Sequence, residues 1–354
     1  MSLLISNTLA QIAPLDENAM ALARARQHQL TKPRGSLGRL ETLSIQLAGI
    51  TRNPQPRFRD PVIITLAGDH GIARQGVSAY PPQVTPQMVL NFVNGGAAIN
   101  VLARHIGARV VVGDLGVDAE FPATLALAHK KVARGTRDFS VEPAMSRAQA
   151  ERAVEAGIEI VTNEIARGAD LVGTGDMGIG NTTASAAIIA CLTRRQPHEV
   201  TGRGTGIDSA QLKAKVALIE RALTRHRPNS RDALDVLSHV GGFEIGGLAG
   251  VMLGAAAQRV PIVLDGFISG AAALLAFTFA PAVRDYMIPA HQSVEIGHQV
   301  TLDALGVTPL FNLDLRLGEG TGAALGMSLC IAAAKILDEM ATFAQAGVSE
   351  QTKH

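Results

Sequence analysis

The stretch LVGTGDMGIGNTTASAA, residues 171–187, passes from an apolar run through a glycine-rich turn into an alanine-rich segment. Continuous apolar runs are typical of parallel strands that are buried on both faces. The glycines let backbone amides approach a ligand closely, and the start of a helix favours negative charge. The stretch therefore predicts a strand–loop–helix unit with an anion-binding loop.

Short apolar runs of the same kind alternate with helical segments along most of the chain. This alternation predicts strands that pair in parallel, so we expect an α/β fold with a doubly wound (Rossmann-like), mostly parallel sheet. The runs cover residues 61–68, 108–116, 169–175 and 260–266, with weaker patterns at 286–290 and 311–318. Glycine and aspartate cluster where the runs end. Because ligands of such sheets bind beyond the carboxyl ends of the strands, we expect one site built from several loops.

The two ends of the chain show a different pattern. Polar amphipathic helices are predicted near residues 15–30 and 36–50, and a segment with three prolines, 51–61, is predicted to be a linker. The last helix, from about residue 320 to 346, ends in the polar tail GVSEQTKH. We expect this helix to leave the sheet and pack with the N-terminal helices.

Composition argues against a nucleic-acid partner. Of the 354 residues, 32 are Lys or Arg and 31 are Asp or Glu, and Trp is absent. A nucleic-acid-binding protein would normally show a basic surplus and aromatic stacking surfaces. Cys191 and Cys330 lie in apolar helical stretches and are predicted to be buried free thiols of a reducing compartment. The partner is then a small molecule or a second copy of the chain.

No segment is predicted to direct the chain to a membrane. The N-terminus lacks the basic region of a signal peptide. The longest apolar candidate, GFISGAAALLAFTFAPAV (266–283), is interrupted by glycine and proline, so it is predicted to be a buried helix followed by a turn. We expect the protein to be cytoplasmic.

The glycine loop after residue 172 is the first candidate for a functional site. Its position between a strand and a helix predicts a phosphate site, with Asn181, Thr182 and Thr183 as further donors and capping groups. The alternative is a turn that only permits tight packing of helix on strand.

Gly173, Gly175 and Gly178 also spell the G-x-G-x-x-G of a dinucleotide site. That site needs a second strand ending in an acid about 20 residues further on. Residues 194–204, RRQPHEVTGRG, do not resemble a buried strand, and Asp176 would repel a pyrophosphate. A P-loop is excluded because no G-K-[ST] follows the glycines. A dinucleotide-dependent dehydrogenase stays as an alternative function.

A metal phosphohydrolase is a second alternative. Asp69 and His70 follow an apolar run. His291, Glu295 and His298 stand at i, i+4 and i+7, which would place them on one face of a helix. A glycine and a proline weaken that helix and no zinc motif is complete, so buried histidines with hydrogen-bond partners are the simpler interpretation. A third alternative is a non-catalytic nucleotide-binding protein.

A second glycine loop opens the segment 201–223 and leads into a helix. Arg203 or Lys215 could reach an anion there. The alternative for Lys215 is a position on a solvated helix face, along which its methylene groups lie.

Glu319 is a lone acid in RLGEGTGAAL, residues 316–325. Gly318 and Gly320 flank it and let another molecule approach, and an apolar helical run follows. A carboxylate kept away from water has a raised pKa, which suits a general base near neutral pH. The alternative is an acid that stabilises the dipole of its helix.

Several stretches together resemble one known family, nicotinate-nucleotide–dimethylbenzimidazole phosphoribosyltransferase. The resemblance runs in order over about residues 8 to 340. It is carried by KPRGSLGRLE (32–41), AGDHG (67–71), NGGAAINVLA (94–103), GDMGIGNTT (175–183), VGGFEIGGLAGVMLGAA (240–256), PIVLDGFIS (261–269) and LRLGEGTGAAL (315–325).

The resemblance implies an enzyme that converts nicotinate mononucleotide and 5,6-dimethylbenzimidazole to α-ribazole 5′-phosphate and nicotinate, for the lower ligand of cobalamin. It implies a homodimer, and neither a metal nor an organic cofactor. It also implies a small helical domain from both chain ends, residues 1–55 with 331–354, beside a large α/β catalytic domain, residues 56–330.

The resemblance also assigns roles to single residues. Glu319 matches the catalytic glutamate, Lys215 a lysine near the active site, and Asp176 an acid that is Glu in some members, so its reach here is one methylene shorter. Tyr80 and Met88 fall at the benzimidazole pocket and Ser293 on the nicotinate side. The residues matched to phosphate and substrate contacts are Gly175, Gly178, Ile179, Gly180, Asn181 and Thr182, with Gly318 and Gly320 beside Glu319.

Overall fold

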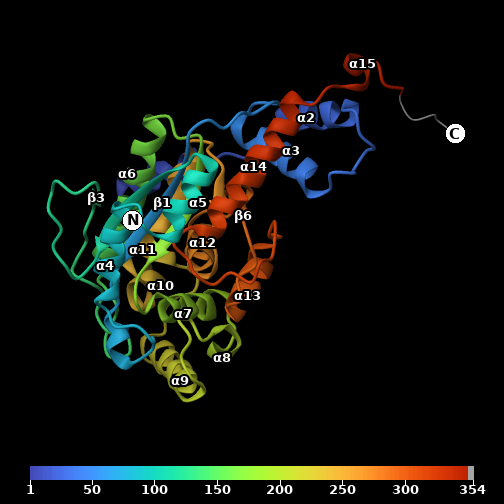
Figure 1. Cartoon of the computed structure of the whole chain (residues 1–354). Helices are drawn as coiled ribbons and strands as arrows, with labels where there is room; N and C mark the ends of the chain where they lie inside the picture. The colour runs from blue at the N-terminus through green and yellow to red at the C-terminus, as the bar shows by residue number, and fades with distance from the viewer. Residues whose placement is uncertain (350–354) are drawn as a thin grey trace.

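A six-stranded parallel sheet forms the centre of the protein (Figure 1). The computed structural model describes residues 1–349 of the chain. The strand order is β3-β2-β1-β4-β5-β6, and every neighbouring pair is parallel. The strands are β1 (Pro61–Gly68), β2 (Arg109–Gly116), β3 (Ala128–His129), β4 (Leu171–Met177), β5 (Ile262–Leu264) and β6 (Met287–Pro289). The predicted α/β fold with a parallel sheet is confirmed.

Helices cover both faces of the sheet. They are α1 (Leu3–Gln11), α2 (Glu17–Gln29), α3 (Arg39–Thr51), α4 (Val84–Val93), α5 (Ala98–Ile106), α6 (Arg147–Ala166), α7 (Asn181–Thr193), α8 (Pro197–Val200), α9 (Ser209–His226), α10 (Ala233–Val240), α11 (Phe243–Ala257), α12 (Phe267–Phe279), α13 (Ile296–Leu305), α14 (Thr321–Glu339) and α15 (Phe343–Ala346), with two 3-10 helices, η1 (Gly71–Gln75) and η2 (Pro281–Tyr286).

β1 is buried along its whole length and supplies side chains to two separate cores. Ile64 and Leu66 belong to the core under α11 and α12, whereas Ile63 and Ala67 belong to the core under α4, α5 and α14. This division follows from the strand period of two, which points successive side chains to opposite faces. A strand buried on both faces needs a continuous apolar run, which is why the sequence identifies it.

The strand order reverses between β1 and β4. The chain adds β2 and β3 on one side of β1, and then crosses to β4, β5 and β6 on the other. The carboxyl ends of β1 and β4 lie so close that a Cβ on Gly178 would stand 2.3 Å from the Gly68 carbonyl oxygen. Loops diverge at such a switch point and leave a crevice, so a ligand site is expected there.

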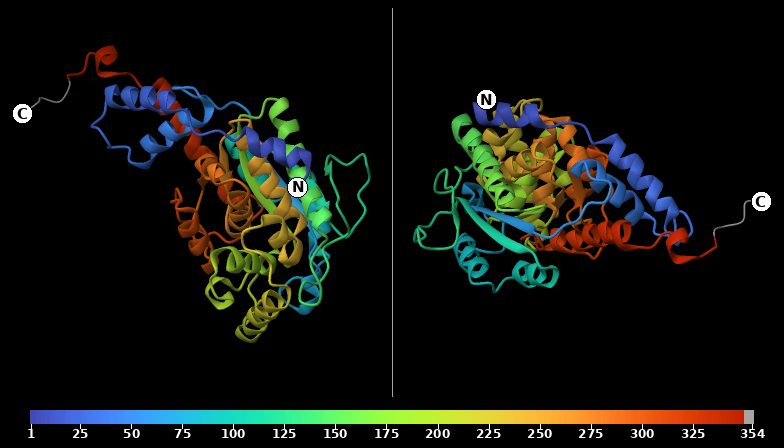
Figure 2. Two further views of the ribbon diagram at one scale, coloured as in Figure 1. Left: turned by 180° about the vertical axis from the view of Figure 1, so that it is seen from behind. Right: turned by 90° about the horizontal axis from the view of Figure 1, so that it is seen from above.

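Helices from both chain ends pack together away from the sheet, at the upper right of Figure 1 and again in both views of Figure 2. α2 and α3 contact each other and α14, and Ala23, Ala48 and Leu337 form their small shared core. α1, in contrast, packs on α6 and α11. α14 runs unbroken through residues 330 and 331, the boundary expected from the resemblance. The two-domain division stays a prediction.

The weak pattern at residues 311–318 is not a strand. Only Phe311 pairs, in an isolated bridge with His291. Asp314 has φ 55, a left-handed conformation that interrupts an extended ladder, and Leu313 and Leu317 are both 59% exposed. The sequence analysis also missed α1 and the two-residue strand β3. The last helix ends at Glu339 rather than near residue 346, and the end of the polar tail, 350–354, lies outside the described residues.

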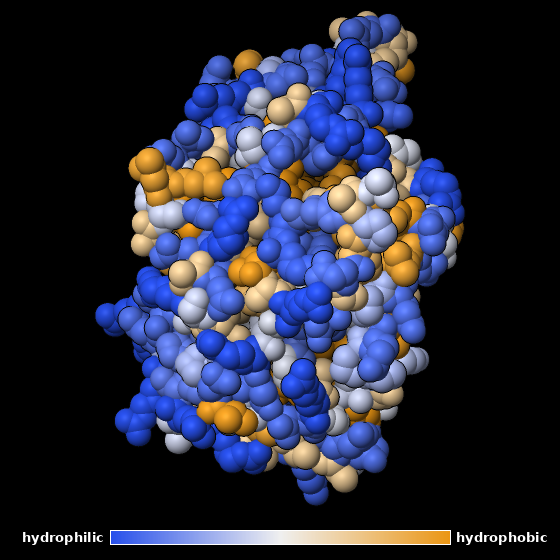
Figure 3. Space-filling model, turned by 90° about the vertical axis from the view of Figure 1, so that its left-hand side faces the viewer, coloured by the Kyte–Doolittle hydropathy of each residue, from blue (hydrophilic) through white to orange (hydrophobic). Residues whose placement is uncertain are grey.

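α14 is the one helix of residues 1–349 that is long and apolar enough to cross a membrane by length and composition. It packs against α3, α5 and the sheet, so it is a core helix of this fold. The face drawn in Figure 3 is mostly hydrophilic, with apolar side chains in separate patches. Scattered apolar residues of this kind are normal at protein surfaces. The segment 266–283 forms the buried helix α12, as predicted.

Candidate functional site

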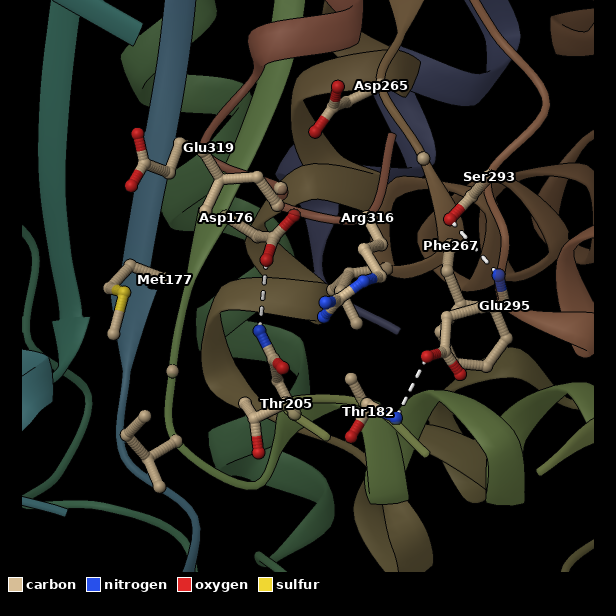
Figure 4. A pocket seen from close by; sticks show the side chains of 18 of the residues that line it. Asp176, Met177, Thr182, Thr205, Asp265, Phe267, Ser293, Glu295, Arg316 and Glu319 are labelled. Carbon is tan, nitrogen blue, oxygen red and sulfur yellow. Dashed lines mark hydrogen bonds between the residues drawn. The ribbon is translucent and has the colours of Figure 1, made fainter. Parts of the chain in front are cut away.

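A cavity of about 330 Å³ lies at the carboxyl ends of β1, β4, β5 and β6 (Figure 4). It is lined by Tyr80, Val84, Met88, Asp176, Met177, Gly178, Ile179, Asn181, Thr182, Gly204, Thr205, Asp265, Gly266, Phe267, Ile268, His291, Ser293, Glu295, Arg316, Leu317, Gly318 and Glu319. Most residues that the sequence analysis selected are therefore brought together. Of the residues that the resemblance matched to the site, Gly175, Gly180, Lys215 and Gly320 lie outside the lining.

Glu319 sits in a loop with an unusual backbone. Gly318, Glu319 and Gly320 have φ 81, 64 and 100, three successive left-handed residues. This conformation is uncommon for a residue with a side chain, and such strain concentrates at functional sites. The Thr65 hydroxyl on β1 donates to the Glu319 carbonyl oxygen at 2.9 Å and holds the loop on the sheet.

Glu319 is 6% exposed. Burial raises its pKa and the nearby Asp265 carboxylate raises it further, while the Ile99 amide, which donates to Oε2 at 3.3 Å, acts in the opposite direction. The dipole interpretation needs a correction, because α14 begins only at Thr321 and the carboxylate meets the N-terminus of α5 instead. A carboxyl group with a raised pKa at a cavity wall can accept a proton near neutral pH.

The two flanking glycines are needed by the protein itself. A Cβ on Gly318 would lie 3.1 Å from Asp176 Oδ2, and one on Gly320 would lie 2.8 Å from Ile63 Cγ2. Gly318 still lines the cavity, whereas Gly320 faces β1. Besides the room that they leave for a ligand, close packing and positive φ are an independent reason for both glycines.

The loop between β4 and α7 has the geometry of an anion site. Gly180 has φ 99 and is the N-cap residue of α7. The amide of Ile179 already donates to Thr85 Oγ1, and that of Asn181 to the Gly178 carbonyl. The amides of Gly178, Gly180 and Thr182 have no acceptor within the described residues, so they can donate to an anion at this helix N-terminus.

Asp176 lies beside that loop and is buried. Asn181 Nδ2 donates to its Oδ2 at 3.0 Å, as the dashed line in Figure 4 shows. Burial raises the pKa of Asp176 well above its ordinary value, and the nearby Asp265 and Glu244 carboxylates add to this. Burial therefore disfavours the ionised form of Asp176 at this wall of the cavity.

Lys215 is 1% exposed, so the alternative of a solvated helix face is wrong. Its Nζ donates to Thr182 Oγ1 at 2.8 Å and to the Gly202 carbonyl at 3.4 Å. Burial lowers the pKa of Lys215 to about 8, although the Glu295 carboxylate opposes this. Lys215 therefore supports the anion loop from behind. Arg203 instead bonds within its own loop, to the Ile207 carbonyl and Ser209.

The metal interpretation of the 291–298 segment fails on geometry. α13 begins only at Ile296, so His291 and Glu295 precede the helix and share no helical face with His298. Burial, helped by His291, lowers the pKa of His298 to about 3, and its Nδ1 accepts a hydrogen bond from the Ser293 amide. Within residues 1–349 no group of three His, Cys, Asp or Glu side chains has metal-binding geometry.

Asp69 and His70 have separate partners. The His70 Nε2 lies 2.6 Å from Glu244 Oε1, and both side chains are fully buried. Burial lowers the pKa of His70, but the Glu244 carboxylate outweighs this and leaves it raised. Asp69 accepts from the Asp118 amide at 2.8 Å. His70 packs directly under the anion loop, since a Cβ on Gly180 would stand 3.2 Å from the His70 Cβ.

The dinucleotide interpretation also meets a structural obstacle. Gly173 and Gly175 lie within β4, not in the loop after it. A Cβ on Gly175 would be 2.2 Å from the Glu319 carbonyl oxygen, so this glycine lets the Glu319 loop rest on the strand. Residues 194–204 contain the short helix α8 and no strand.

The structure adds cavity residues that the sequence analysis did not select. Arg316 points its guanidinium group toward the middle of the cavity, and Phe267 and Thr205 complete the walls (Figure 4). Asp265 follows β5 directly, and an aspartate beside glycine after an apolar run was the available signal. Tyr80 is 56% exposed at the cavity mouth, while Ser293 is buried.

Comparisons with known proteins agree over the whole chain. A family model described as Phosphoribosyltransferase matches residues 12–348. Nicotinate-nucleotide–dimethylbenzimidazole phosphoribosyltransferase of Roseiflexus sp. (strain RS-1) is 64% identical over 351 residues, 99% of each chain. The protein of that name from Desulforudis audaxviator (strain MP104C) is 57% identical over 346 residues, 98% of each chain. The crystal structure of CobT from Thermus thermophilus superposes with a TM-score of 0.91 at 47% identity, and the match covers 94% of this chain and 100% of that one.

Proposed function

Since this chain belongs to the family of nicotinate-nucleotide–dimethylbenzimidazole phosphoribosyltransferases, we propose that its cavity is the active site and Glu319 the general base. The enzyme transfers the 5-phosphoribosyl group of nicotinate mononucleotide to 5,6-dimethylbenzimidazole. The products are α-ribazole 5′-phosphate and nicotinate, and the reaction belongs to the assembly of the lower ligand of cobalamin.

The chemistry requires one proton acceptor. A ring nitrogen of the benzimidazole attacks C1′ from the face opposite to the departing nicotinate, which converts a β-nucleotide to an α-nucleotide. The attacking base becomes cationic as the bond forms, and the proton on its other nitrogen then leaves. Glu319 accepts this proton, because its carboxylate is at the cavity wall and its pKa is raised toward neutral pH.

The phosphate of the mononucleotide is proposed to bind the free amides of Gly178, Gly180 and Thr182. The N-terminus of α7 supplies partial positive charge, and Lys215, bonded to Thr182, supplies a full one behind the loop. This arrangement holds the ribose with C1′ directed into the cavity, where the two bases exchange.

The flat benzimidazole is proposed to lie between Tyr80 and Met88, with nicotinate on the side of Ser293. All three residues line the same cavity. Asp176 lines the same cavity, and its raised pKa disfavours a negative charge beside an anionic substrate.

A cytoplasmic homodimer is proposed for the working enzyme. The support for the homodimer is the family resemblance, which implies it. No metal or organic cofactor enters the proposed reaction, because proton transfer to Glu319 and departure of nicotinate complete it.

The observation that carries the proposal is that Glu319 and the anion loop, far apart in sequence, line one cavity. Its test is nicotinate release from the mononucleotide, measured with and without dimethylbenzimidazole. We expect release that depends on the benzimidazole. Activity that instead required NAD, or that was lost with chelator, would favour the dehydrogenase or the metal phosphohydrolase.

A further inference from the structure

The start of α14 is capped by a side chain from another part of the fold. The helix has no capping hydrogen bond from its own N-cap residue, Gly320. Asp265, which directly follows β5, supplies the missing acceptor. Its Oδ2 accepts from the Gly320 amide at 3.1 Å, and its Oδ1 accepts from the amides of Gly322 at 2.7 Å and Ala323 at 3.2 Å.

Asp265 is itself fixed on the sheet. Its carboxylate is 1% exposed, and its amide donates to Thr174 Oγ1 on β4 at 3.2 Å. Thr174 in turn bonds to Ser269 of α12 at 2.9 Å. Both Asp265 oxygens accept from amides, which is the pattern of an ionised carboxylate. Burial leaves the pKa of Asp265 raised, although the His291 ring, 3.8 Å away, and the three amides oppose this.

These contacts fix the backbone position of Glu319. Glu319 immediately precedes the capped residue Gly320, and its own φ of 64 is unfavourable without external support. The Thr65 hydroxyl holds its carbonyl from the β1 side, and Asp265 holds the next amide from the β5 side. Between these two supports the Glu319 side chain is directed into the cavity.

We propose that Asp265 is a positioning residue for the reaction, which orients the Glu319 carboxylate by holding the amides of Gly320, Gly322 and Ala323. This inference rests on the proposed role of Glu319 as the base. Asp265 also faces Glu319 with a negative charge. The other titratable groups that line the cavity with Glu319 are Asp176 at the end of β4, Arg316, His291, Glu295 and Tyr80. From α5, the Ile99 amide contacts the Glu319 carboxylate.

The first test is Asp265→Asn, which keeps the size of the side chain. Its NH₂ group cannot accept a hydrogen bond, so at least one of the backbone amides that donate to Asp265 loses its acceptor. We expect kcat to fall about 10- to 100-fold, as for a misplaced catalytic group, with the KM for nicotinate mononucleotide little changed. We also expect the acid limb of the pH profile to move to lower pH, because loss of the Asp265 charge lowers the pKa of Glu319. The matched control, Thr278→Val, removes a hydroxyl from the same helix, α12, that bonds to the Leu274 carbonyl and not to the Asp265 cluster. It should leave kcat and the acid limb unchanged.

The double variant with Glu319→Gln separates this inference from the proposed function. If Asp265 acts through Glu319, the double variant loses no more than Glu319→Gln alone. Losses that multiply would overturn the positioning role, as would an Asp265→Asn enzyme with parental kcat and an unmoved limb. A Glu319→Gln enzyme with parental activity would instead overturn the assignment of the base.

If circular dichroism shows that Asp265→Asn does not fold, Thr174→Val tests the same positioning role with a smaller disturbance. It removes the hydroxyl that anchors the Asp265 amide. A lowered kcat with an unchanged KM supports the positioning role, and an unchanged kcat in the folded variant overturns it.

Discussion

The Glu319 carboxylate accepts a hydrogen bond from the Ile99 amide, at the first turn of α5, across 220 residues of sequence. This contact orients one oxygen, Oε2, toward a helix N-terminus and leaves the other free for the cavity. The amide stabilises the ionised form, but burial and the Asp265 charge outweigh it, so the pKa of Glu319 is raised. A base needs this balance, because it must be ionised before attack and then hold the proton it accepts.

Glu319→Gln should abolish most of the activity without unfolding the protein. The amide keeps an oxygen for Ile99 but cannot accept a proton, so we expect kcat to fall by about 10² to 10⁴. In the parent, the rate should rise with pH through the raised pKa of Glu319, since only the ionised form is active. This limb should be absent from the variant. A variant within about threefold of the parent would show a contribution under 1 kcal/mol and identify Glu319 as an orienting group.

The product phosphate should lie on the amides of residues 178–182, with Gly178, Gly180 and Thr182 as its donors. A crystal soaked with α-ribazole 5′-phosphate tests this directly. Phosphate density on Arg203 alone would contradict the site.

Gly180→Ala should raise the KM for the mononucleotide, because φ 99 disfavours a side chain and the new Cβ would stand 3.2 Å from His70. Gly206→Ala is the control. Gly206 has φ 105 with open space around it, so the backbone strain is similar but the anion loop is untouched. Equal effects of the two substitutions on KM would argue against a phosphate role for the loop.

Lys215→Met should weaken binding of the mononucleotide about 10- to 100-fold, the range for a lost hydrogen bond to a charged group. The pKa of Lys215 is lowered to about 8, so its charge is present below that pH and lost above it. The parent kcat/KM should therefore fall above pH 8, and the variant should lack this basic limb. Lys213→Met, on the exposed side of the same helix, should behave as the parent. A basic limb that persists in Lys215→Met would assign it to another group.

Dialysis against EDTA should leave the rate unchanged. The histidines that suggested a metal are bonded elsewhere, His70 to Glu244 and His298 to the Ser293 amide. A loss of activity that one added divalent ion restores would show that the cavity carboxylates bind a metal in the working enzyme.

The sequence by itself determined the architecture. The runs that became β1, β2, β4 and β5 were recognised because a strand buried on both faces must be apolar throughout, and this constraint is local. The glycine loop before Asn181 was also recognised from a local signal, because its strand, glycines and helix follow one another in the sequence. The run at 311–318 misled because a single residue, Asp314, takes a left-handed conformation that its neighbours do not reveal.

The charge states and orientations of the site residues were decided by the tertiary structure. The sequence left Lys215 between a contact with an anion and a position on a solvated helix face, and in the structure α9 buries it against Thr182. Asp265 was not selected from the sequence, and its contact with the start of α14 is visible only in the structure. His291, Glu295 and His298 have helical spacing in the sequence, but α13 begins only at Ile296. Charge state and orientation depend on burial and on donors brought from distant strands. The spacing of residues in the sequence indicates local structure, but it does not give the distances between groups on separate strands and helices.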